Sequence, residues 1–439
     1  MSTKTPDPLE FYLQRLYRRS ERVVKLGLDA TRNLLDELGN PQNAMICVHV
    51  AGTNGKGSVC AMVASILQAA GFRTGLYTSP HLLKYNERVR VNGVAISDAD
   101  LRTLLEDVDV ASQRAMKRPG GRDVTFFEFG TGVAFEYFKR QGVHFAVIET
   151  GMGGRLDATN VITPAVSVIT SIGMDHMEHL GDTLEAIAIE KAGIIKPGCP
   201  VVVGDLPSEA MDVVKDAART CKAQVILAKD AATVWRKHQT WSGQRLKVET
   251  EDGHYGPLNL PLVGCHQLAN TALAVSAIEV LRERLGIAIP KQAVEKGLEH
   301  VQWPGRFQLI GMEPPMVIDG AHNPHAARSL RLSLEELADG RGLGLIAGFL
   351  SDKDAGGYLK EMAPLVRRCW IVQIDHDRAM PLSFELQQAH AAGIEAVPVK
   401  FSEAVEDAKR WATAHNGMIC ISGSLYLAGE ALRFFDKTV

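Results

Sequence analysis

Residues 49–59, HVAGTNGKGSV, join the end of an apolar run to the start of an apolar helical pattern. A glycine-rich turn between a strand and a helix leaves main-chain N–H groups free to surround an anion at the helix N-terminus. The loop departs from the G-x-x-x-x-G-K-[ST] pattern, because Val50 replaces the first glycine and Gly57 separates Lys56 from Ser58. We still expect it to bind nucleotide phosphates, with Lys56 as a point charge. The alternative is an ordinary glycine-rich turn with a solvated lysine.

Short β-rich apolar runs alternate with amphipathic helical stretches on both sides of this loop. The pattern predicts an α/β fold whose first part is a P-loop-type parallel-sheet ATPase domain with helices on both faces. The runs that predict strands are 46–52, 73–79, 144–150, 165–172 and 200–205. The patterns that predict helices are 58–70, 98–116, 127–141, 182–193 and 208–220.

The chain changes character after these elements. Alternation and turn residues over 233–262 predict a small antiparallel sheet, and long helical patterns follow at 266–286 and 290–301. The βα alternation then restarts, which predicts a smaller Rossmann-like α/β domain. The boundary falls near 295–304, and we divide the chain into an ATP-binding domain, residues 1–296, and a C-terminal domain, residues 297–439. The second group of strand runs is 315–320, 342–349, 368–375, 395–400 and 418–424.

Composition excludes several function classes. The formal net charge of −3 over 439 residues gives no global field for nucleic acid or an anionic membrane. No C-x-x-C pair occurs among the seven cysteines, so we expect reduced core thiols in a cytoplasmic protein. The N-terminal stretch MSTKTPDPLEFYLQRLYRRSERV has no apolar signal region, and no exposed coiled-coil pattern is visible. We therefore expect a cytoplasmic monomer that binds small molecules.

A second glycine cluster, IETGMGGRLDATN at 148–160, follows another strand. It resembles a dinucleotide fingerprint, but the third glycine is missing and no helical pattern begins at RLDATN. Glu149 stands at the carboxyl end of the strand, where ligands bind in open α/β sheets, and a carboxylate there suits Mg²⁺. The alternative is a solvated glutamate at a strand end.

Two further clusters follow predicted strands. Asp175, His176, Glu178 and His179 have the composition of a metal site, so a zinc hydrolase is a rival interpretation. The chain lacks H-E-x-x-H on a helix and a cysteine pair that would complete such a site. The turn DGAHNPH places Asp319, His322, Asn323 and His325 together, and Asp319 is either a site residue or an ordinary cap.

Several motifs together carry a family resemblance. They are AGTNGKGSV, TSPHL, ERVRVNG, ETGMGGRLDATN, DHMEHLGDTLEAIAIEKAGIIK, WPGRF, DGAHNP and GSLYL, in this order between Val50 and Tyr426. The chain resembles the bacterial folylpolyglutamate synthase/dihydrofolate synthase family, relatives of the Mur ligases. The resemblance implies an ATP-dependent ligase that adds L-glutamate to dihydropteroate and to tetrahydrofolate through an acyl phosphate. The first domain would then be of the Mur ligase central type and the second a glutamate ligase domain.

The resemblance also implies roles for individual residues. Mg²⁺, one ion or two, would be held by Ser79, Glu149 and His176, although the loop alone suggests Ser58. Catalytic roles fall to Lys56, to Lys191 as a carbamate, and to His322. The ATP-binding residues would be Thr53, Asn54, Gly55, Lys56, Gly57, Ser58, Asn270, Arg306 and Asp319. The pterin and glutamate contacts would be Thr125, Phe127, Glu128, Leu156, Asp157, Ala158 and Ser424.

Alternatives remain for these residues and for the function. Lys191 can be a solvated helix lysine, and at least one of Phe126, Phe127 and Phe129 is expected in the core. A P-loop kinase or motor-type NTPase would transfer phosphate without glutamate, and a non-catalytic module would only bind nucleotide. The nearest enzymatic alternative is a Mur-type peptidoglycan amino-acid ligase. The WPGRF and DGAHNP turns argue against a simple NTPase, which needs no second domain of this kind.

Overall fold

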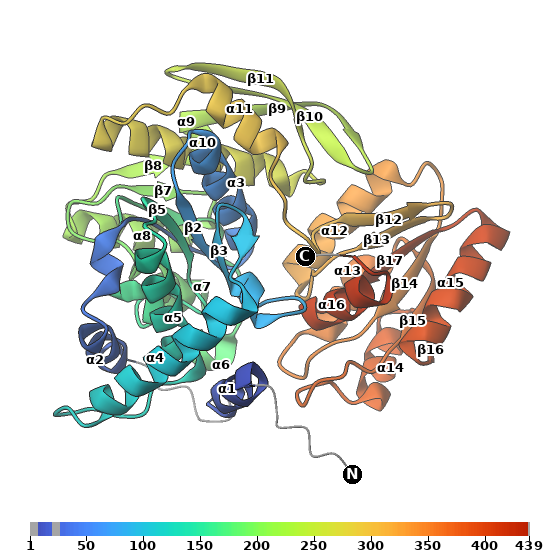
Figure 1. The fold of residues 1–439 in the computed structure, drawn as a ribbon. Helices are drawn as coiled ribbons and strands as arrows, with labels where there is room; N and C mark the ends of the chain where they lie inside the picture. Colours follow the sequence, from blue (N-terminus) through green and yellow to red (C-terminus); the bar gives the residue numbers. More distant parts are fainter. Residues whose placement is uncertain (1–7, 20–26, 438–439) are drawn as a thin grey trace, which may run out of the picture.

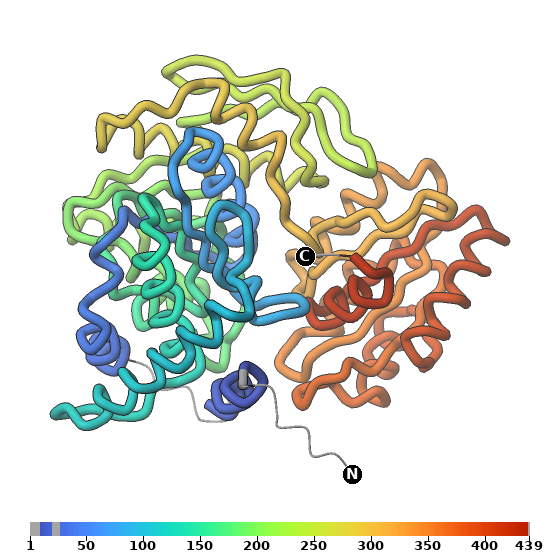
Figure 2. Tube along the Cα trace, viewed as in Figure 1, coloured from blue at the N-terminus to red at the C-terminus, as the bar shows by residue number. Residues whose placement is uncertain are grey.

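The computed structural model describes residues 8–19 and 27–437. Two α/β bodies stand side by side, and a three-stranded sheet lies over the top of the first (Figure 1, Figure 2). The predicted α/β class with two successive sheets is confirmed. Much of the N-terminal stretch discussed for a signal region lies outside the described residues. Within the described residues no helix combines the length and apolarity needed to cross a membrane.

The first body contains an eight-stranded sheet in the order β4-β3-β2-β5-β1-β6-β7-β8. The six strands from β2 to β8 in this order are parallel to one another. At the other edge, β3 pairs antiparallel with both β2 and β4. Strand β1 lies between β5 and β6, so the carboxyl ends of these three strands meet at one edge. The strands are β1 (Ile46–Ala51), β2 (Thr74–Tyr77), β3 (Val89–Val91), β4 (Val94–Ala95), β5 (Phe145–Glu149), β6 (Val166–Ile169), β7 (Val201–Val203) and β8 (Val225–Leu227).

Helices cover both faces of this sheet, because alternate residues along each strand are buried on opposite sides. Val48 and Val50 of β1 pack in one core with α3, α10 and α11, whereas Cys47 packs in a second core with α2, α4 and α5. Helices α7 and α8 pack on the second face further along. The helices are α1 (Pro8–Arg18), α2 (Asp29–Glu37), η1 (Pro41–Ala44), α3 (Lys56–Ala69), η2 (Tyr85–Arg88), α4 (Asp98–Met116), α5 (Phe126–Arg140), η3 (Ala158–Val161), α6 (Met177–Leu180), α7 (Leu184–Ala192), α8 (Ser208–Thr220) and α9 (Ala228–Ala231).

The predicted antiparallel excursion and the two helices after it are also present. The three strands are β9 (Ala232–Thr240), β10 (Gly243–Thr250) and β11 (Gly253–Leu260), and the helices are α10 (His266–Leu285) and α11 (Lys291–Glu299). Leu246, Leu258 and Leu260 of this sheet share a core with Leu273 and Ile278 of α10. The three-stranded sheet therefore packs α10 against α3, the helix that follows the glycine-rich loop.

The second body contains a six-stranded sheet in the order β12-β13-β17-β14-β15-β16, parallel except at the β12 edge. The chain changes sheets between Glu299 at the end of α11 and Gln308 at the start of β12. The elements are β12 (Gln308–Met312), β13 (Pro315–Ile318), α12 (Pro324–Leu337), β14 (Leu343–Ala347), α13 (Ala355–Met362), β15 (Val366–Ile371), α14 (Leu382–Ala391), β16 (Ala396–Pro398), α15 (Phe401–His415), β17 (Met418–Ser422) and α16 (Leu425–Phe434).

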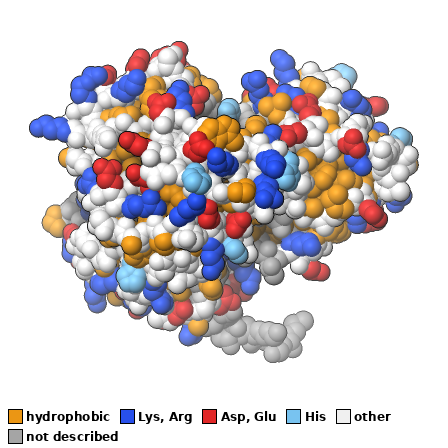
Figure 3. Space-filling model, turned by 90° about the horizontal axis from the view of Figure 1, so that it is seen from above, with side chains coloured by type: hydrophobic (Ala, Val, Ile, Leu, Met, Phe, Trp, Pro, Cys, Tyr) orange, Lys and Arg blue, Asp and Glu red, His pale blue; other side chains and the backbone are white. Residues whose placement is uncertain are grey.

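Two expectations need correction. The first sheet is not wholly parallel, because Asn92 and Gly93, both with positive φ, turn the chain back between β3 and β4. The cysteines are all free, but Cys265 is exposed at the N-terminal end of α10 and so is not a core residue. Acidic and basic side chains are interspersed over the face in Figure 3, in keeping with the small net charge.

Candidate active site

The glycine-rich loop joins β1 to α3 within four residues, 52–55. Gly55 has φ +86° and stands directly before the helix, and a Cβ there would lie 2.5 Å from Asn270 Oδ1. A Cβ on Gly52, at φ +153°, would overlap Thr170 Oγ1. Side chains are therefore excluded at both positions, and main-chain N–H groups at the start of α3 face the site. Helix α3 begins at Lys56, two residues earlier than expected.

Two lysines converge on this loop. Lys56 Nζ donates to the carbonyl oxygens of Gly52 at 3.0 Å and Thr53 at 3.2 Å. Lys191 Nζ, on α7, donates to the same Gly52 oxygen at 2.8 Å. Burial, together with the charge of Lys56, lowers the pKa of Lys191 to about 7. Lys191 is therefore a buried residue of the site with an amine that loses its proton near neutral pH, and not a solvated helix lysine.

Glu149 and Ser79 meet at the ends of β5 and β2. The Ser79 main-chain N–H donates to Glu149 Oε2 at 3.2 Å. Burial raises the pKa of Glu149, although nearby Lys56 and other positive groups oppose this. No lysine or arginine of the described residues forms an ion pair with this carboxylate, which is 5% exposed. A buried carboxylate without a cation, beside a serine hydroxyl, has the oxygen ligands that suit Mg²⁺.

Two cavities flank the loop. The larger, about 470 Å³ including space open to solvent, is lined by Gly57, Ser79, Glu149, Trp303 and Arg306 among others. The smaller, about 230 Å³, is lined by Thr53, Lys56, His176 and Lys191 among others. The structure thus gathers the loop, both lysines and the three candidate metal ligands around one strand edge, with His176 on the opposite side of the loop from Ser79 and Glu149.

The rival zinc site does not form. Glu178 and His179 are both exposed on the short helix α6. Among residues 8–19 and 27–437 no group of three or more His, Cys, Asp or Glu side chains is arranged to hold a metal ion. The oxygen-rich pair Ser79 and Glu149 is therefore the stronger candidate for a cation.

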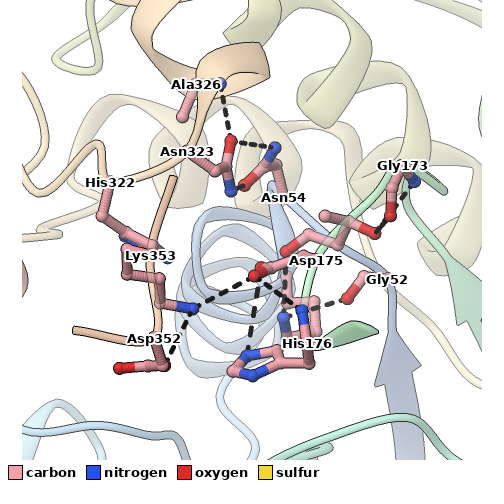
Figure 4. A network of polar contacts seen from close by, with 12 residues as sticks. Gly52, Asn54, Gly173, Asp175, His176, His322, Asn323, Ala326, Asp352 and Lys353 are labelled. Atoms are coloured by element: carbon pink, nitrogen blue, oxygen red, sulfur yellow. Dashed lines mark hydrogen bonds and ion pairs between the residues drawn. The ribbon is translucent and has the colours of Figure 1, made fainter. Parts of the chain in front are cut away.

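Asp175 instead links the two bodies (Figure 4). Lys353, in the loop after β14, lies 3.1 Å from Asp175 Oδ1, and the two side chains are only 10% and 12% exposed. Burial raises the pKa of Asp175, but the charges of His176 and Lys353 outweigh it and hold the pKa at about 2. Burial lowers the pKa of the neighbouring His176 to about 4, so this imidazole is neutral at pH 7 and able to bind a metal.

A second link joins the nucleotide loop to the start of α12. Asn54 and Asn323 exchange side-chain hydrogen bonds of 3.3 and 3.1 Å, while Asn323 also caps α12 by accepting from Ala326 N–H at 2.9 Å (Figure 4). Asn54 further contacts His325 Nδ1 at 3.1 Å. The DGAHNPH turn thus forms direct hydrogen bonds with the glycine-rich loop.

The remaining candidate ATP residues lie around the same loop. The Asn270 side chain contacts the loop at Gly55, and the buried Ser58 hydroxyl accepts from Gln267 of α10 at 3.4 Å. Arg306 is half-buried in the larger cavity. Asp319 accepts main-chain hydrogen bonds from Phe307 at 2.8 Å and Ala321 at 2.7 Å. Its carboxylate therefore ties the WPGRF turn to the DGAH turn.

The candidate pterin residues have well-defined structural roles. Thr125 and Glu128 form a capping box at the start of α5, and Arg122 pairs with both carboxylate oxygens of Glu128 at 2.7 and 2.8 Å. Asp157 accepts from the N–H groups of Gly151 and Met152, both at 2.9 Å, and holds the glycine turn. Leu156 is half-buried and Ala158 buried.

The aromatic residues of α5 divide as expected. Phe129 is a core residue, whereas Phe127 is only partly buried and packs over Gly151, where a Cβ would lie 2.5 Å from the ring. In the second body, Nδ1 of His322 donates to the Gly320 carbonyl oxygen at 2.8 Å, because that oxygen can only accept. Ser424 is buried and caps α16 by accepting from Tyr426 N–H at 3.1 Å.

Sequence reasoning missed two contacts that shape the site. Lys353 was not singled out, although the run SDKDAG follows a predicted strand. Trp303 was part of a quoted motif without a role, yet its ring covers Gly57 so closely that a Cβ there would lie 2.5 Å away. For Lys353 the available signal was a charged residue shortly after a predicted strand. For Trp303 it was an aromatic residue at the predicted domain boundary.

Comparison with known proteins decides the family. The Mur ligase middle domain matches residues 50–278, and the Mur ligase glutamate ligase domain matches residues 305–425. The chain is 35% identical to the dihydrofolate synthase/folylpolyglutamate synthase of Bacillus subtilis, covering 94% of this chain and 96% of that protein.

The chain belongs to the dihydrofolate synthase/folylpolyglutamate synthase family of Mur ligases.

Other members of the family agree. The chain is 37% identical to the folylpolyglutamate synthase of Lacticaseibacillus casei over 93% of this chain and 94% of that protein. A crystal structure of the Mycobacterium tuberculosis folylpolyglutamate synthase with ADP and AMPPCP superposes with a TM-score of 0.92 at 31% identity, covering 98% of this chain and 100% of that one. A folylpolyglutamate synthase complex with AMPPCP and folate superposes with a TM-score of 0.85 at 36% identity over 97% and 99%.

Proposed function

We propose that this protein is an ATP-dependent ligase that adds L-glutamate to dihydropteroate and to tetrahydrofolate. The single observation that carries the proposal is a convergence at one strand edge, beside the second domain. The glycine-rich loop meets two lysines there and the buried Glu149 carboxylate, which has no cation partner among the described residues. The family relatives support this function over a peptidoglycan ligase, since those named here are folylpolyglutamate or dihydrofolate synthases.

In the proposed reaction the acceptor carboxylate attacks the γ-phosphate of ATP, and the amine of glutamate then displaces phosphate from the acyl phosphate. The loop residues Thr53 to Ser58 bind the phosphates through main-chain N–H groups, and Lys56 neutralises the phosphoryl group as it moves. Asn270 and Asp319 bind ATP from the two sides, while Arg306 faces the transferring group from the second domain. Binding and charge neutralisation, rather than covalent catalysis, then supply most of the rate.

One or two Mg²⁺ ions would be held by Ser79, Glu149 and His176, and would neutralise phosphate charge. Lys191, whose amine is neutral above about pH 7, would carry a carbamate and so present an anion in place of a cation. The acceptor's pterin would lie between the α5 start and the glycine turn, near Thr125, Phe127, Glu128 and the stretch Leu156 to Ala158. The incoming glutamate would lie near His322 and Ser424.

Three further expectations belong to this proposal. The domains are residues 1–296 and 297–439, the protein acts as a monomer in the cytoplasm, and it binds neither nucleic acid nor membrane. A dynamic light-scattering or sedimentation measurement of the purified protein tests the monomer directly.

Product analysis tests the function. With ATP, Mg²⁺, glutamate and dihydropteroate we expect dihydrofolate, and with tetrahydrofolate we expect its polyglutamates. Dihydrofolate absent while tetrahydrofolate is extended would withdraw the first activity. ADP release at full rate without glutamate would instead indicate a kinase or NTPase, and turnover of a UDP-linked muropeptide would indicate a peptidoglycan ligase.

A further inference from the structure

Arg88 is a buried cation that neither the fold nor the proposed mechanism has yet used. It ends η2, directly before β3, and is 7% exposed. Its Nε donates to Nδ1 of His81 at 2.8 Å. A guanidinium can only donate, so Nδ1 of His81 is the acceptor and this imidazole is neutral. The pair therefore keeps one full positive charge.

This charge has no protein counter-ion in the described part of the chain. No Asp or Glu oxygen there lies within ion-pair distance of the Arg88 guanidinium, and Nη1 and Nη2 have no acceptor. The adjacent Glu87 is fully engaged, since its carboxylate accepts from the N–H groups of Leu82, Leu83 and Lys84. Buried arginines are normally paired, and even the half-buried Arg122 is paired with Glu128, so the unpaired charge calls for an anionic ligand.

Aromatic rings surround the guanidinium. It lies 5.0 Å from the centre of the Phe126 ring and 5.7 Å from that of Tyr85. Tyr17 of α1 stacks on the Phe126 ring, with the two ring centroids 5.7 Å apart and an interplanar angle of 17°. Such faces hold a guanidinium by cation–π attraction and also suit a flat substrate ring. Nη1 and Nη2 of Arg88 are not among the side-chain atoms of the described residues that are both fully buried and without a hydrogen-bond partner. They therefore remain accessible to a ligand.

The cluster borders the reaction centre. His81 follows Ser79 by two residues, and Thr78 N–H donates to the Arg88 carbonyl at 3.0 Å. Phe126 directly precedes the candidate pterin contact Phe127 on α5. Through His81 and Phe126, Arg88 therefore contacts chain neighbours of both Ser79 and Phe127.

We propose that Arg88 binds the free carboxylate of the pteroate or folate acceptor by a bidentate pair, and so positions that substrate for activation. The proposal rests on the proposed function, because it assumes a pteroate-type acceptor. A carboxylate is favoured over an ATP phosphate because the glycine loop already provides the phosphate site, and because the surrounding rings match the benzoyl group that carries the carboxylate.

Equilibrium binding of two probes tests this. Pteroate and its methyl ester share the pterin and benzoyl rings, but the ester has a methyl group in place of the carboxylate charge, and both can be titrated by quenching of protein fluorescence. We expect wild-type protein to bind pteroate about 10- to 100-fold more tightly than the ester, Arg88→Met to bind the two about equally, and Arg88→Lys to retain part of the preference. Arg140→Met, which alters an arginine on α5 paired with Glu136, should behave as wild type.

The outcomes separate the competing explanations. A structural role for Arg88 would weaken both probes equally and leave their ratio unchanged, which would overturn the proposal. If Arg88→Met does not fold, Arg88→Gln and Arg88→Lys give the same ratio test. If wild type and the Arg88 variants all prefer pteroate over the ester by the same factor, this inference is overturned but the proposed function is not. A wild type that binds neither probe overturns the proposed function as well.

Discussion

Lys56 and Lys191 donate hydrogen bonds to one and the same main-chain oxygen, that of Gly52, at 3.0 and 2.8 Å. Two ammonium groups on one acceptor repel each other, and burial adds to the penalty on Lys191. We therefore expect this loop to bind anions on both sides: a phosphate at Lys56 and, if the proposed modification occurs, a carbamate at Lys191.

The shared acceptor makes stability depend on pH. The pKa of Lys191 is about 7 in the folded protein and has its ordinary value of 10.5 when unfolded, so between these values only the unfolded chain binds the proton. The free energy of unfolding then rises with pH over this window, by on the order of a few kcal/mol. Urea unfolding of wild type and Lys191→Met at pH 6.5, 8 and 9.5 measures it. A difference between the two proteins that does not change with pH contradicts this.

A neutral amine at position 191 also reacts with carbon dioxide. We expect activity at pH 8 to fall when carbon dioxide is removed from the buffer and to return with bicarbonate, while the low activity of Lys191→Gln does not respond. A ¹³C NMR carbamate signal after addition of ¹³C-bicarbonate, absent from Lys191→Gln, identifies the group. Full activity without carbon dioxide would show that the lysine acts unmodified.

We expect the Mg²⁺ concentration needed for activity to depend on pH through Glu149. Burial raises the pKa of this carboxyl group, and a carboxylate binds Mg²⁺ only after losing its proton. The Mg²⁺ concentration needed for half-maximal rate should therefore increase as the pH falls, and Glu149→Gln should need far more Mg²⁺ at every pH. Rate measurements against Mg²⁺ at pH 6, 7 and 8 check this. An unchanged requirement in the variant removes Glu149 from the metal site.

The Asp175–Lys353 pair couples the two domains. Removing one partner leaves the other charge largely buried and unpaired, so Lys353→Met should lower kcat about 10- to 100-fold with little change in the affinity for ATP. Asp175 also neighbours His176, and the double variant with Asp175→Asn separates the two effects. We expect the double variant to be less impaired than the product of the single effects. Strict additivity of the two losses would mean that the ion pair does not act as a unit.

Gly57 controls the position of Trp303. A Cβ at this residue would lie 2.5 Å from the Trp303 ring, so Gly57→Ala displaces the tryptophan at the domain junction. We expect a shift in tryptophan fluorescence and a loss of activity of about tenfold or more, since the ring also lines the larger cavity. Gly311→Ala is the control, because no atom lies within 4 Å of a Cβ there and its φ is not positive. An unchanged spectrum in Gly57→Ala contradicts the packing.

Most of the fold followed from local sequence patterns. The apolar runs ending in glycine-rich turns predicted β1 and β5, and helical spacing predicted α4 and α8 to the residue. The β3–β4 hairpin was missed although Asn92-Gly93 is a strong turn signal, because its strands are only three and two residues long. Helix α1 was missed because the N-terminal stretch was considered only as a leader, not for its amphipathic spacing.

The site was predictable only where it is local. The phosphate loop and Glu149 follow strands directly, so their position was fixed by the order of elements. The pairs Asn54–Asn323 and Asp175–Lys353 join residues 269 and 178 positions apart, and no local pattern encodes such contacts. The structural engagement of Glu128 by Arg122 was equally hidden, because it depends on how the 117–123 loop folds back onto α5.

The central claim is that this phosphate loop activates a carboxylate as an acyl phosphate. Dihydropteroate labelled with ¹⁸O in its carboxyl group, incubated with ATP, Mg²⁺ and glutamate, tests it most directly through the isotope content of the released phosphate. One ¹⁸O atom should appear in each inorganic phosphate formed, in step with dihydrofolate. Phosphate that carries no label while dihydrofolate accumulates would contradict the account.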